Sequence, residues 1–327
     1  MSRNLRFGLT NTSARQSFEL SRSVRQLIFS LGNEEATFGR RRFPGLGRPA
    51  ESRLELIGVT FLDGYRAALG TTQADALLPS LQTVPLELRG FAYEGAAMAL
   101  GLLDILTPWN RSRFRRYLER ASPHVYMAHV GLGWAWARLR VNVEKRLAGV
   151  DPVLGWLAVD GYGFHEGYFH WPRYLERRDA PPLRGYAARA FDQGLGRSLW
   201  FVEGADAERI ISRLQGFIPS RQPDLWSGVG LACAYAGGAE LDAVRVLQKA
   251  AGASAPHLAQ GVVFAAAARE RAGNPAEHTS QVAEAVCGRA SRELAQLADE
   301  TFARLGEGGD FPAYERWRQD IRQHFTS

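Results

Sequence analysis

A glycine recurs six times along the chain at intervals typical of stacked helix pairs. The recurring positions are Gly95, Gly131, Gly167, Gly196, Gly228 and Gly261, which gives intervals of 36, 36, 29, 32 and 33 residues. A bulky residue follows each glycine three positions later, and in four segments the next residue is alanine. Glycine one turn before alanine forms a stripe of small residues on which two helix backbones can approach closely. We therefore predict helical-hairpin repeats stacked as a solenoid or toroid.

The rest of the chain also indicates an all-α protein. From about residue 50 onward, long segments rich in Ala, Leu, Arg and Glu are broken by short signals such as Asp151-Pro152 and Gly237-Gly238. Alternating apolar and polar residues, which would indicate strands, are scarce. We predict a single all-α repeat domain over residues 49–327, preceded by a basic arm over residues 1–48.

The positive charge is concentrated in the predicted arm. The formal net charge is +6, and residues 1–50 alone contain nine Arg and three Glu, so the remainder is neutral overall. A DNA-reading protein normally carries its basic residues on a recognition motif, and the sequence contains none. We therefore do not expect a nucleic-acid partner.

The sequence contains no stretch that resembles a secretion signal or a membrane span. Its first residues alternate Arg with polar residues, and the apolar runs 92–106 and 122–137 are interrupted by charges or are too short. We expect a cytoplasmic protein without membrane association.

The segment Asp160–Pro172 has the highest density of polar and aromatic side chains. His165 and His170 are five residues apart and do not share a helix face, so the zinc-protease pattern is absent. Glu166 and His170 are four apart and form a candidate acid–base pair. The alternative is that the histidines only satisfy buried backbone groups. Phosphate-binding and nucleophile-elbow motifs are also absent, and we predict no metal and no cofactor.

Polar residues precede four of the repeat glycines, namely Glu94, Glu166, Ser227 and Gln260. If the repeats stack in register, these side chains line one surface. The neighbours of Glu94 are apolar enough to raise the pKa of its carboxyl if it is buried. The alternative for Glu94 is an ion pair with an arginine such as Arg197.

Six segments carry a resemblance to a known family: LRGFAYEGAAMALGLLD, HVGLGWAWARL, DGYGFHEGYFH, GLGRSLWFVEGAD, DLWSGVGLACAYAGG and LAQGVVFAAAAR. In this order, over about residues 50 to 325, they resemble the UnbL-type enediyne-biosynthesis family. Members are typically encoded beside companion UnbV and UnbU families and a polyketide synthase that makes a linear polyene. The resemblance implies a role in converting or handling such a polyene, and it supplies no catalytic residue set.

These observations lead to one main hypothesis, in which an all-α shell encloses a hydrophobic polyene substrate. Glu166 and His170 would be proton donor and acceptor, oriented by Asp160 and His165, and Glu94 would complete the catalytic group. The expected substrate-binding residues are Arg197, Trp134, Tyr168, Trp200, Trp226 and Gln260.

Two alternatives belong to other functional classes. In the first, the chain is a non-catalytic scaffold that binds the companion proteins. In the second, it is a cofactor-independent cyclase or isomerase that acts on a polyene or a terpene-like substrate. A closed cavity lined by aromatic side chains and carboxylates favours an enzyme, whereas an open groove with exposed aromatic side chains favours a scaffold. An oligomer is compatible with either.

Overall fold

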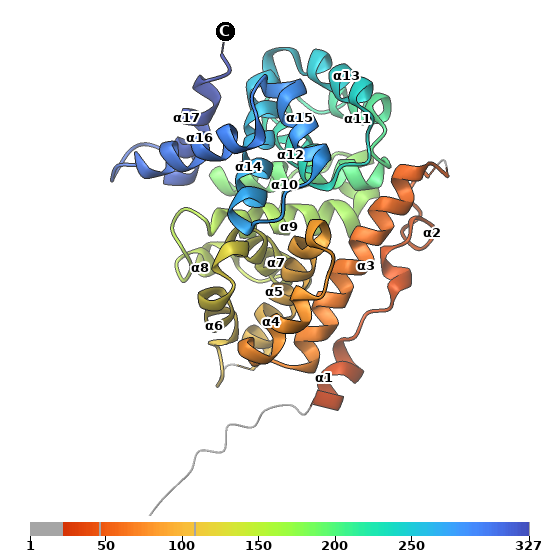
Figure 1. The fold of residues 1–327 in the computed structure, drawn as a ribbon, viewed down its shortest axis with the longest axis vertical. Helices are drawn as coiled ribbons and strands as arrows, with labels where there is room; N and C mark the ends of the chain where they lie inside the picture. Colours follow the sequence, from red (N-terminus) through yellow and green to blue (C-terminus); the bar gives the residue numbers. More distant parts are fainter. Residues whose placement is uncertain (1–21, 46, 108, 327) are drawn as a thin grey trace, which may run out of the picture.

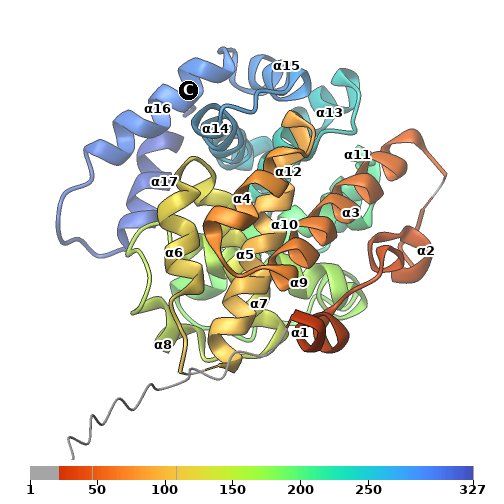
Figure 2. The ribbon, with the colours of Figure 1, turned by 60° about the horizontal axis from the view of Figure 1, so that its bottom comes forward.

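The computed structural model describes residues 22–45, 47–107 and 109–326, and these residues form helices and connecting segments without any strand. The all-α prediction is therefore confirmed for this part of the chain. Eight long helices follow one another through the molecule, each packed against the next (Figures 1 and 2). They are α3 (Pro49–Gly70), α5 (Arg89–Leu106), α7 (Val125–Arg138), α9 (Trp156–Phe169), α10 (Tyr186–Val202), α12 (Gln222–Ala236), α14 (Ala255–Ala272) and α16 (Ser291–Ala303).

Shorter helices alternate with these central helices along the chain. They are α4 (Ala74–Gln82), α6 (Arg113–Arg120), α8 (Val143–Leu147), α11 (Ala207–Gln215), α13 (Leu241–Ala251), α15 (Glu277–Cys287) and α17 (Ala313–Gln323). Between α9 and α10 a π-helical turn, Pro172–Glu176, stands in the corresponding place. Long central helices and shorter helices therefore alternate along the described part of the chain.

Paired glycines explain the close packing of the central helices. Four of these helices each carry two glycines separated by one residue: Gly131 and Gly133, Gly161 and Gly163, Gly194 and Gly196, Gly228 and Gly230. Residues two apart lie about 200° apart around a helix, so the pair faces two different neighbours. In each pair the first glycine contacts the backbone of the preceding central helix and the second contacts that of the following one.

A side chain at these positions would collide with backbone. A Cβ on Gly161 would overlap the carbonyl oxygen of Val130 in α7, and one on Gly163 would overlap that of Phe191 in α10. Backbone cannot yield as a flexible side chain does, so glycine is required at both positions.

The structure corrects the repeat register in two segments. In α9 the glycine equivalent to Gly131 is Gly161, because Gly167 instead faces the side chain of Ser198. In α10 the equivalent is Gly194, because Gly196 contacts the following helix and not the preceding one. Alignment on one glycine per helix does not reveal that four of these helices carry two glycines with different partners.

In the corrected register, the polar residues that directly precede the repeat glycines form one buried row. The sequence predicted that polar side chains at this position would line one surface. Asp160, Gln193, Ser227 and Gln260 each precede the first glycine of their helix. Gln193 Nε2 donates to Asp160 Oδ2 at 2.9 Å, and Ser227 Oγ lies 3.4 Å from Gln193 Oε1 and donates to Gln260 Oε1 at 2.9 Å. Glu166, expected in this row, is replaced by Asp160.

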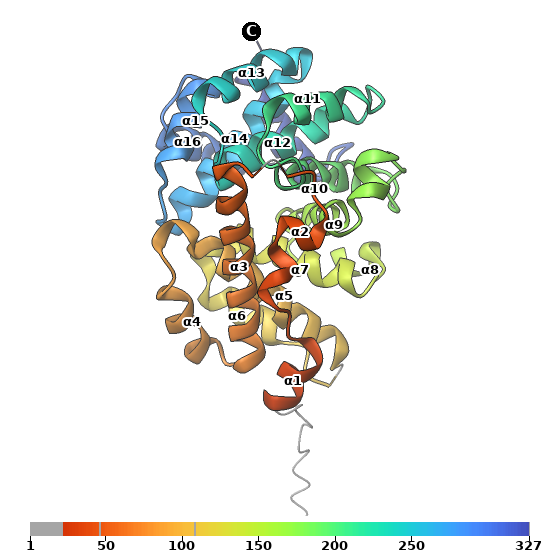
Figure 3. The ribbon, with the colours of Figure 1, turned by 90° about the vertical axis from the view of Figure 1, so that its right-hand side faces the viewer.

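The described part of the predicted arm packs along the helical body (Figure 3). It contains α1 (Arg22–Phe29), the short helix Asn33–Ala36 and α2 (Phe38–Arg41). Its arginines anchor it to the body: Arg25 Nε donates to the Leu69 carbonyl at 3.0 Å and Arg48 pairs with Asp206. The first residues of the arm lie outside the described residues.

Among the described residues, no helix combines the length and the apolar character that crossing a membrane requires.

Candidate functional site

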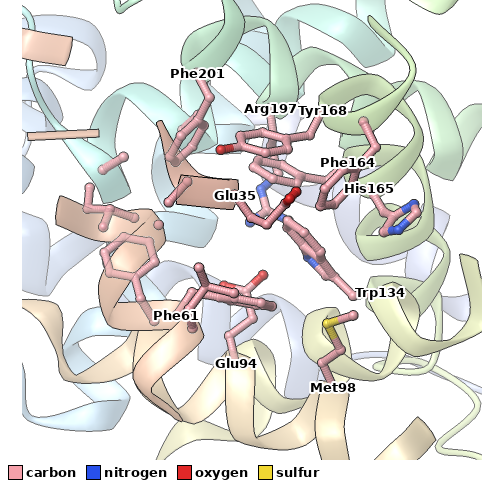
Figure 4. Close-up of a pocket in the computed structure, with 18 of the residues that line it drawn as sticks. Glu35, Phe61, Glu94, Met98, Trp134, Phe164, His165, Tyr168, Arg197 and Phe201 are labelled. Atoms are coloured by element: carbon pink, nitrogen blue, oxygen red, sulfur yellow. The ribbon is translucent and has the colours of Figure 1, made fainter. Parts of the chain in front are cut away.

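The main cavity lies between α3, α5, α7, α9, α10 and α12 and is lined mostly by aromatic and aliphatic side chains (Figure 4). Its empty space is about 820 Å³, including the solvent at its mouth. The aromatic side chains that line it are Phe61, Phe91, Trp134, Phe164, Tyr168, Phe169, Phe201 and Tyr235. Such a cavity has the lining of a small-molecule site.

The N-terminal segment forms one wall of this cavity. Leu31, Glu35 and Ala36 line it, and an ion pair joins Glu35 to Arg41. The Arg41 guanidinium lies 4.8 Å from the Phe169 ring centre. The arm is therefore part of the site, and a ligand in the cavity would contact it.

Glu94 is the carboxylate that faces the cavity from α5, and only 3% of it is exposed. Burial raises the pKa of Glu94 to about 7, although the nearby Arg197 guanidinium opposes the rise. The Trp134 indole also favours the ionised form of Glu94, but Trp134 Nε1 and the Glu94 carboxyl group do not reach hydrogen-bond geometry. Glu94 is therefore suited to exchange a proton near neutral pH.

Arg197 faces the cavity from α10 and is held from behind by Asp160. The two form a buried ion pair, and Gln193 donates a further hydrogen bond to the Asp160 carboxylate. The Arg197 guanidinium lies 5.0 Å from the Phe164 ring centre. Because Asp160 is fully buried and does not line the cavity, its role is to position Arg197. The expected contact of Asp160 with Glu166 and His170 is replaced by this pair.

Three buried nitrogen atoms of cavity-lining residues lack a hydrogen-bond partner within the described part of the chain. They are Trp134 Nε1, His165 Nε2 and Arg197 Nε. A buried donor without a partner costs free energy, so these atoms mark places where a polar group of a ligand would be stabilised.

The predicted acid–base pair, Glu166 and His170, stays together in a surface groove and does not line the main cavity. His165 lines the main cavity, and its Nδ1 lies 3.2 Å from Glu166 Oε1. Burial lowers the pKa of His165, although Glu166 opposes the shift. Glu166 and the exposed His170 line an open surface groove that shares Phe169 with the main cavity, together with Arg140 and Arg173. The structure thus brings His165 to Glu94 and Arg197 and leaves His170 outside.

The remaining predicted binding residues separate in the same way. Trp134 and Tyr168 line the cavity. Trp200 and Trp226 are buried without lining it, and Trp200 Nε1 donates to the Gly237 carbonyl at 2.8 Å. Gln260 belongs to the buried polar row.

The sequence contains a signal for cavity residues that appears only when the correct glycines are aligned. In six central helices, the residue three positions after the glycine that faces the preceding central helix lines a cavity. These residues are Met98, Trp134, Phe164, Arg197, Leu231 and Phe264. The bulky residue after each of these glycines therefore marks the face of the helix that lines a cavity. Phe61 and Phe201 carried no comparable signal.

No group of three or more His, Cys, Asp or Glu side chains in the described ranges is arranged to hold a metal ion.

Comparison with known proteins gives a family and no further relatives. No protein with curated annotation and no solved structure shows significant similarity to the chain. The match to one sequence family extends over residues 20–325, which includes the N-terminal segment and all of the helices that build the cavity. The chain therefore belongs to the family described as "Protein of unknown function (DUF1702)".

Proposed function

We propose that the main cavity binds a long linear polyene and that Glu94 moves a proton on it, as an isomerase or cyclase of natural-product biosynthesis does. The observation that carries the proposal is a buried carboxyl with a raised pKa beside a buried arginine in an aromatic-lined cavity. Aromatic and aliphatic walls favour a hydrocarbon chain over a polar metabolite. The resemblance to UnbL-type proteins supports a polyene in particular.

The proposal gives the repeat a functional meaning. The hairpins would form a curved array, a solenoid or toroid. Its inner face would be the inner row, which consists of the residues three positions after each glycine that faces the preceding central helix. The bulky side chains of this row would then contact the substrate.

The chemistry that fits these groups is a proton shift along an unsaturated carbonyl compound. The Glu94 carboxylate would take a proton from a chain carbon, and the electron pair of that bond would move toward the carbonyl oxygen. Arg197 would stabilise the negative charge on that oxygen, because it is a fixed cation in a site of low dielectric. Glu94 would then return the proton at another carbon, so the step needs no oxidant, reductant or cofactor.

The scaffold alternative is less well supported by the distribution of aromatic side chains. Trp109 and Phe311 are the large aromatic side chains that are about half exposed within the described residues, and they lie outside the main cavity. A scaffold that presents an aromatic surface to UnbV- and UnbU-type partners would expose more of them.

Deuterium exchange tests the proposal directly. The protein is incubated in D₂O with the thioester of a linear conjugated polyene acid, and deuterium in the chain is measured by mass spectrometry. We expect incorporation with the wild-type chain and a loss of about a hundredfold or more with Glu94→Gln. Quenching of tryptophan fluorescence by the polyene should persist in the variant, because Gln keeps the shape of the side chain.

Three outcomes separate the hypotheses. Equal exchange in both proteins removes Glu94 from the chemistry. The absence of binding in a folded wild-type protein contradicts the proposed substrate. Product that forms only when UnbV- and UnbU-type proteins are added favours the scaffold.

A further inference from the structure

A second cavity adjoins the first on the side of α14 and α17. Its empty space is about 420 Å³, including the solvent at its opening. Arg197, Leu231 and Tyr235 line both cavities, so these three side chains form the partition between them. We infer that the second cavity binds the far hydrocarbon end of the chain whose functional group lies beside Glu94 and Arg197 in the first.

The repeat itself connects the two spaces. The inner row passes from Met98, Trp134 and Phe164 in the first cavity, through Arg197 and Leu231 in the partition, to Phe264 in the second. One periodic feature of the sequence therefore lines both cavities in chain order. This continuity is expected of a single binding path and not of two unrelated packing defects.

The walls of the second cavity select a hydrocarbon. Val130, Leu157, Phe264 and Ala268 contribute only carbon atoms, and Trp317 directs its Nε1 away to the Ala298 carbonyl at 3.0 Å. A buried water needs two to four polar partners, and an apolar cavity without them stays dry and takes up apolar guests. The polar groups of the first cavity, by contrast, suit the functionalised end of the chain.

Leu231 is the side chain that would yield to let the chain pass. It is partly exposed although Gly230 and Ala232, its neighbours in the middle of α12, are buried. That exposure is toward the cavities, because Leu231 lines both of them. A leucine changes rotamer without any backbone movement.

The inference rests on the proposed function for the linear shape of the ligand, and the test separates the two. A fluorescent conjugated eighteen-carbon tetraene acid is bound to the full chain and displaced by saturated fatty acids of eight to eighteen carbons. Ala268→Phe fills the second cavity, and Ala232→Phe makes the same change in the first. Circular dichroism and thermal unfolding establish that each variant is folded.

We expect Ala268→Phe to weaken only the long acids. Each methylene that loses its burial weakens binding about fourfold, so exclusion of two or more predicts a loss of about tenfold or greater for the longest acids. The shortest acids should bind as they do to the wild type. Ala232→Phe should weaken short and long acids alike, because every chain must occupy the first cavity.

Met127→Ala supplies an independent test if Ala268→Phe does not fold. Met127 lines the second cavity, and its truncation enlarges that space. We expect the chain length of tightest binding to increase. A folded Ala268→Phe protein that binds long acids as tightly as the wild type overturns the inference while leaving the proposed function intact. Failure of the wild type to bind any acid overturns both.

Discussion

Two buried clusters of charged side chains in this protein use similar residues in opposite ways. In the C-terminal ion cluster, Asp224 and Glu315 are each paired with at least two of Arg189, Arg318 and Arg322, at 2.7–3.1 Å. In the main cavity Arg197 is paired with Asp160, whereas Glu94 has no ion pair within hydrogen-bonding range among the described residues.

The difference appears in the pKa values of the carboxyls. Burial alone would raise the pKa of Asp224 and of Glu315, but the arginines, Arg318 foremost, outweigh it and hold both below their usual values. For Glu94 burial prevails, and its pKa rises to about 7. Full pairing makes a carboxylate structural, whereas incomplete pairing leaves it able to exchange a proton.

Arg318→Met should have the largest effect on stability. Arg318 is fully buried and contacts Asp224, Glu315 and Gln260. Its removal leaves two carboxylates short of a partner, which we expect to lower the free energy of unfolding by about 3–5 kcal/mol. Urea denaturation measures the change.

The matched control is Arg189→Met. Arg189 contacts the same two carboxylates, but its side chain is 35% exposed. We expect a clearly smaller loss, since solvent screens its contribution. Equal losses for the two arginines would contradict the view that burial makes this cluster structural.

Glu94→Gln should stabilise the protein at alkaline pH. The pKa of Glu94 is raised in the folded chain, so the wild type loses stability as the pH rises from the ordinary value of 4.5 through about 7. Gln avoids the buried charge, and we expect a gain of about 3 kcal/mol at pH 8. Chemical denaturation at several pH values should show the gain vanishing below about pH 4.5.

The C-terminal ion cluster has the opposite pH dependence. Because the pKa values of Asp224 and Glu315 are lowered on folding, their stabilisation is present at neutral pH and is lost as the pH falls below their ordinary values. The acid limb of the stability curve should therefore remain in Glu94→Gln and weaken in Arg318→Met. A Glu94 variant that changes the acid limb instead would contradict the assignment of that limb to Asp224 and Glu315.

The rate of proton exchange should rise with pH and level off above about pH 7. In the proposed step the ionised form of Glu94 removes the proton, so the rate follows the fraction of Glu94 that is deprotonated. Below the pKa we expect about a tenfold change per pH unit. A rate that falls through the same range would indicate that the protonated form acts first.

His170→Ala should have the smallest effect. His170 is exposed in the surface groove and does not line the main cavity. We expect deuterium incorporation within about twofold of the wild type, a difference that solvent-exposed substitutions commonly give. Loss of exchange in this variant with retention in Glu94→Gln would move the site from the cavity to the groove and restore the first interpretation of the Asp160–Pro172 segment.

The sequence alone was sufficient for the class of fold and for one carboxyl group, that of Glu94, which the structure places in the main cavity. Small residues at a helical repeat imply close helix pairs, because glycine leaves no side chain between two backbones. Glu94 was a candidate for a carboxyl with a raised pKa because its sequence neighbours are apolar. Within a helix, the local sequence determines much of what surrounds a residue. The density of polar residues in Asp160–Pro172 predicted the cavity residues less well. Residues close together in this segment line two different places, His165 the main cavity and Glu166 and His170 the surface groove.

The tertiary structure alone decided which glycine of each pair faces which neighbouring helix, and with it which residues line the cavities. The sequence of a single helix shows two glycines on different faces of that helix. Only the packing of α7, α9 and α10 shows which of the two contacts the preceding helix and which the following one. The same packing turned Asp160 toward Arg197 and away from Glu166. Composition and spacing determined that the helices would approach closely. Which side chains share a cavity depends on distances between segments far apart in the chain, and those distances are set by the fold as a whole.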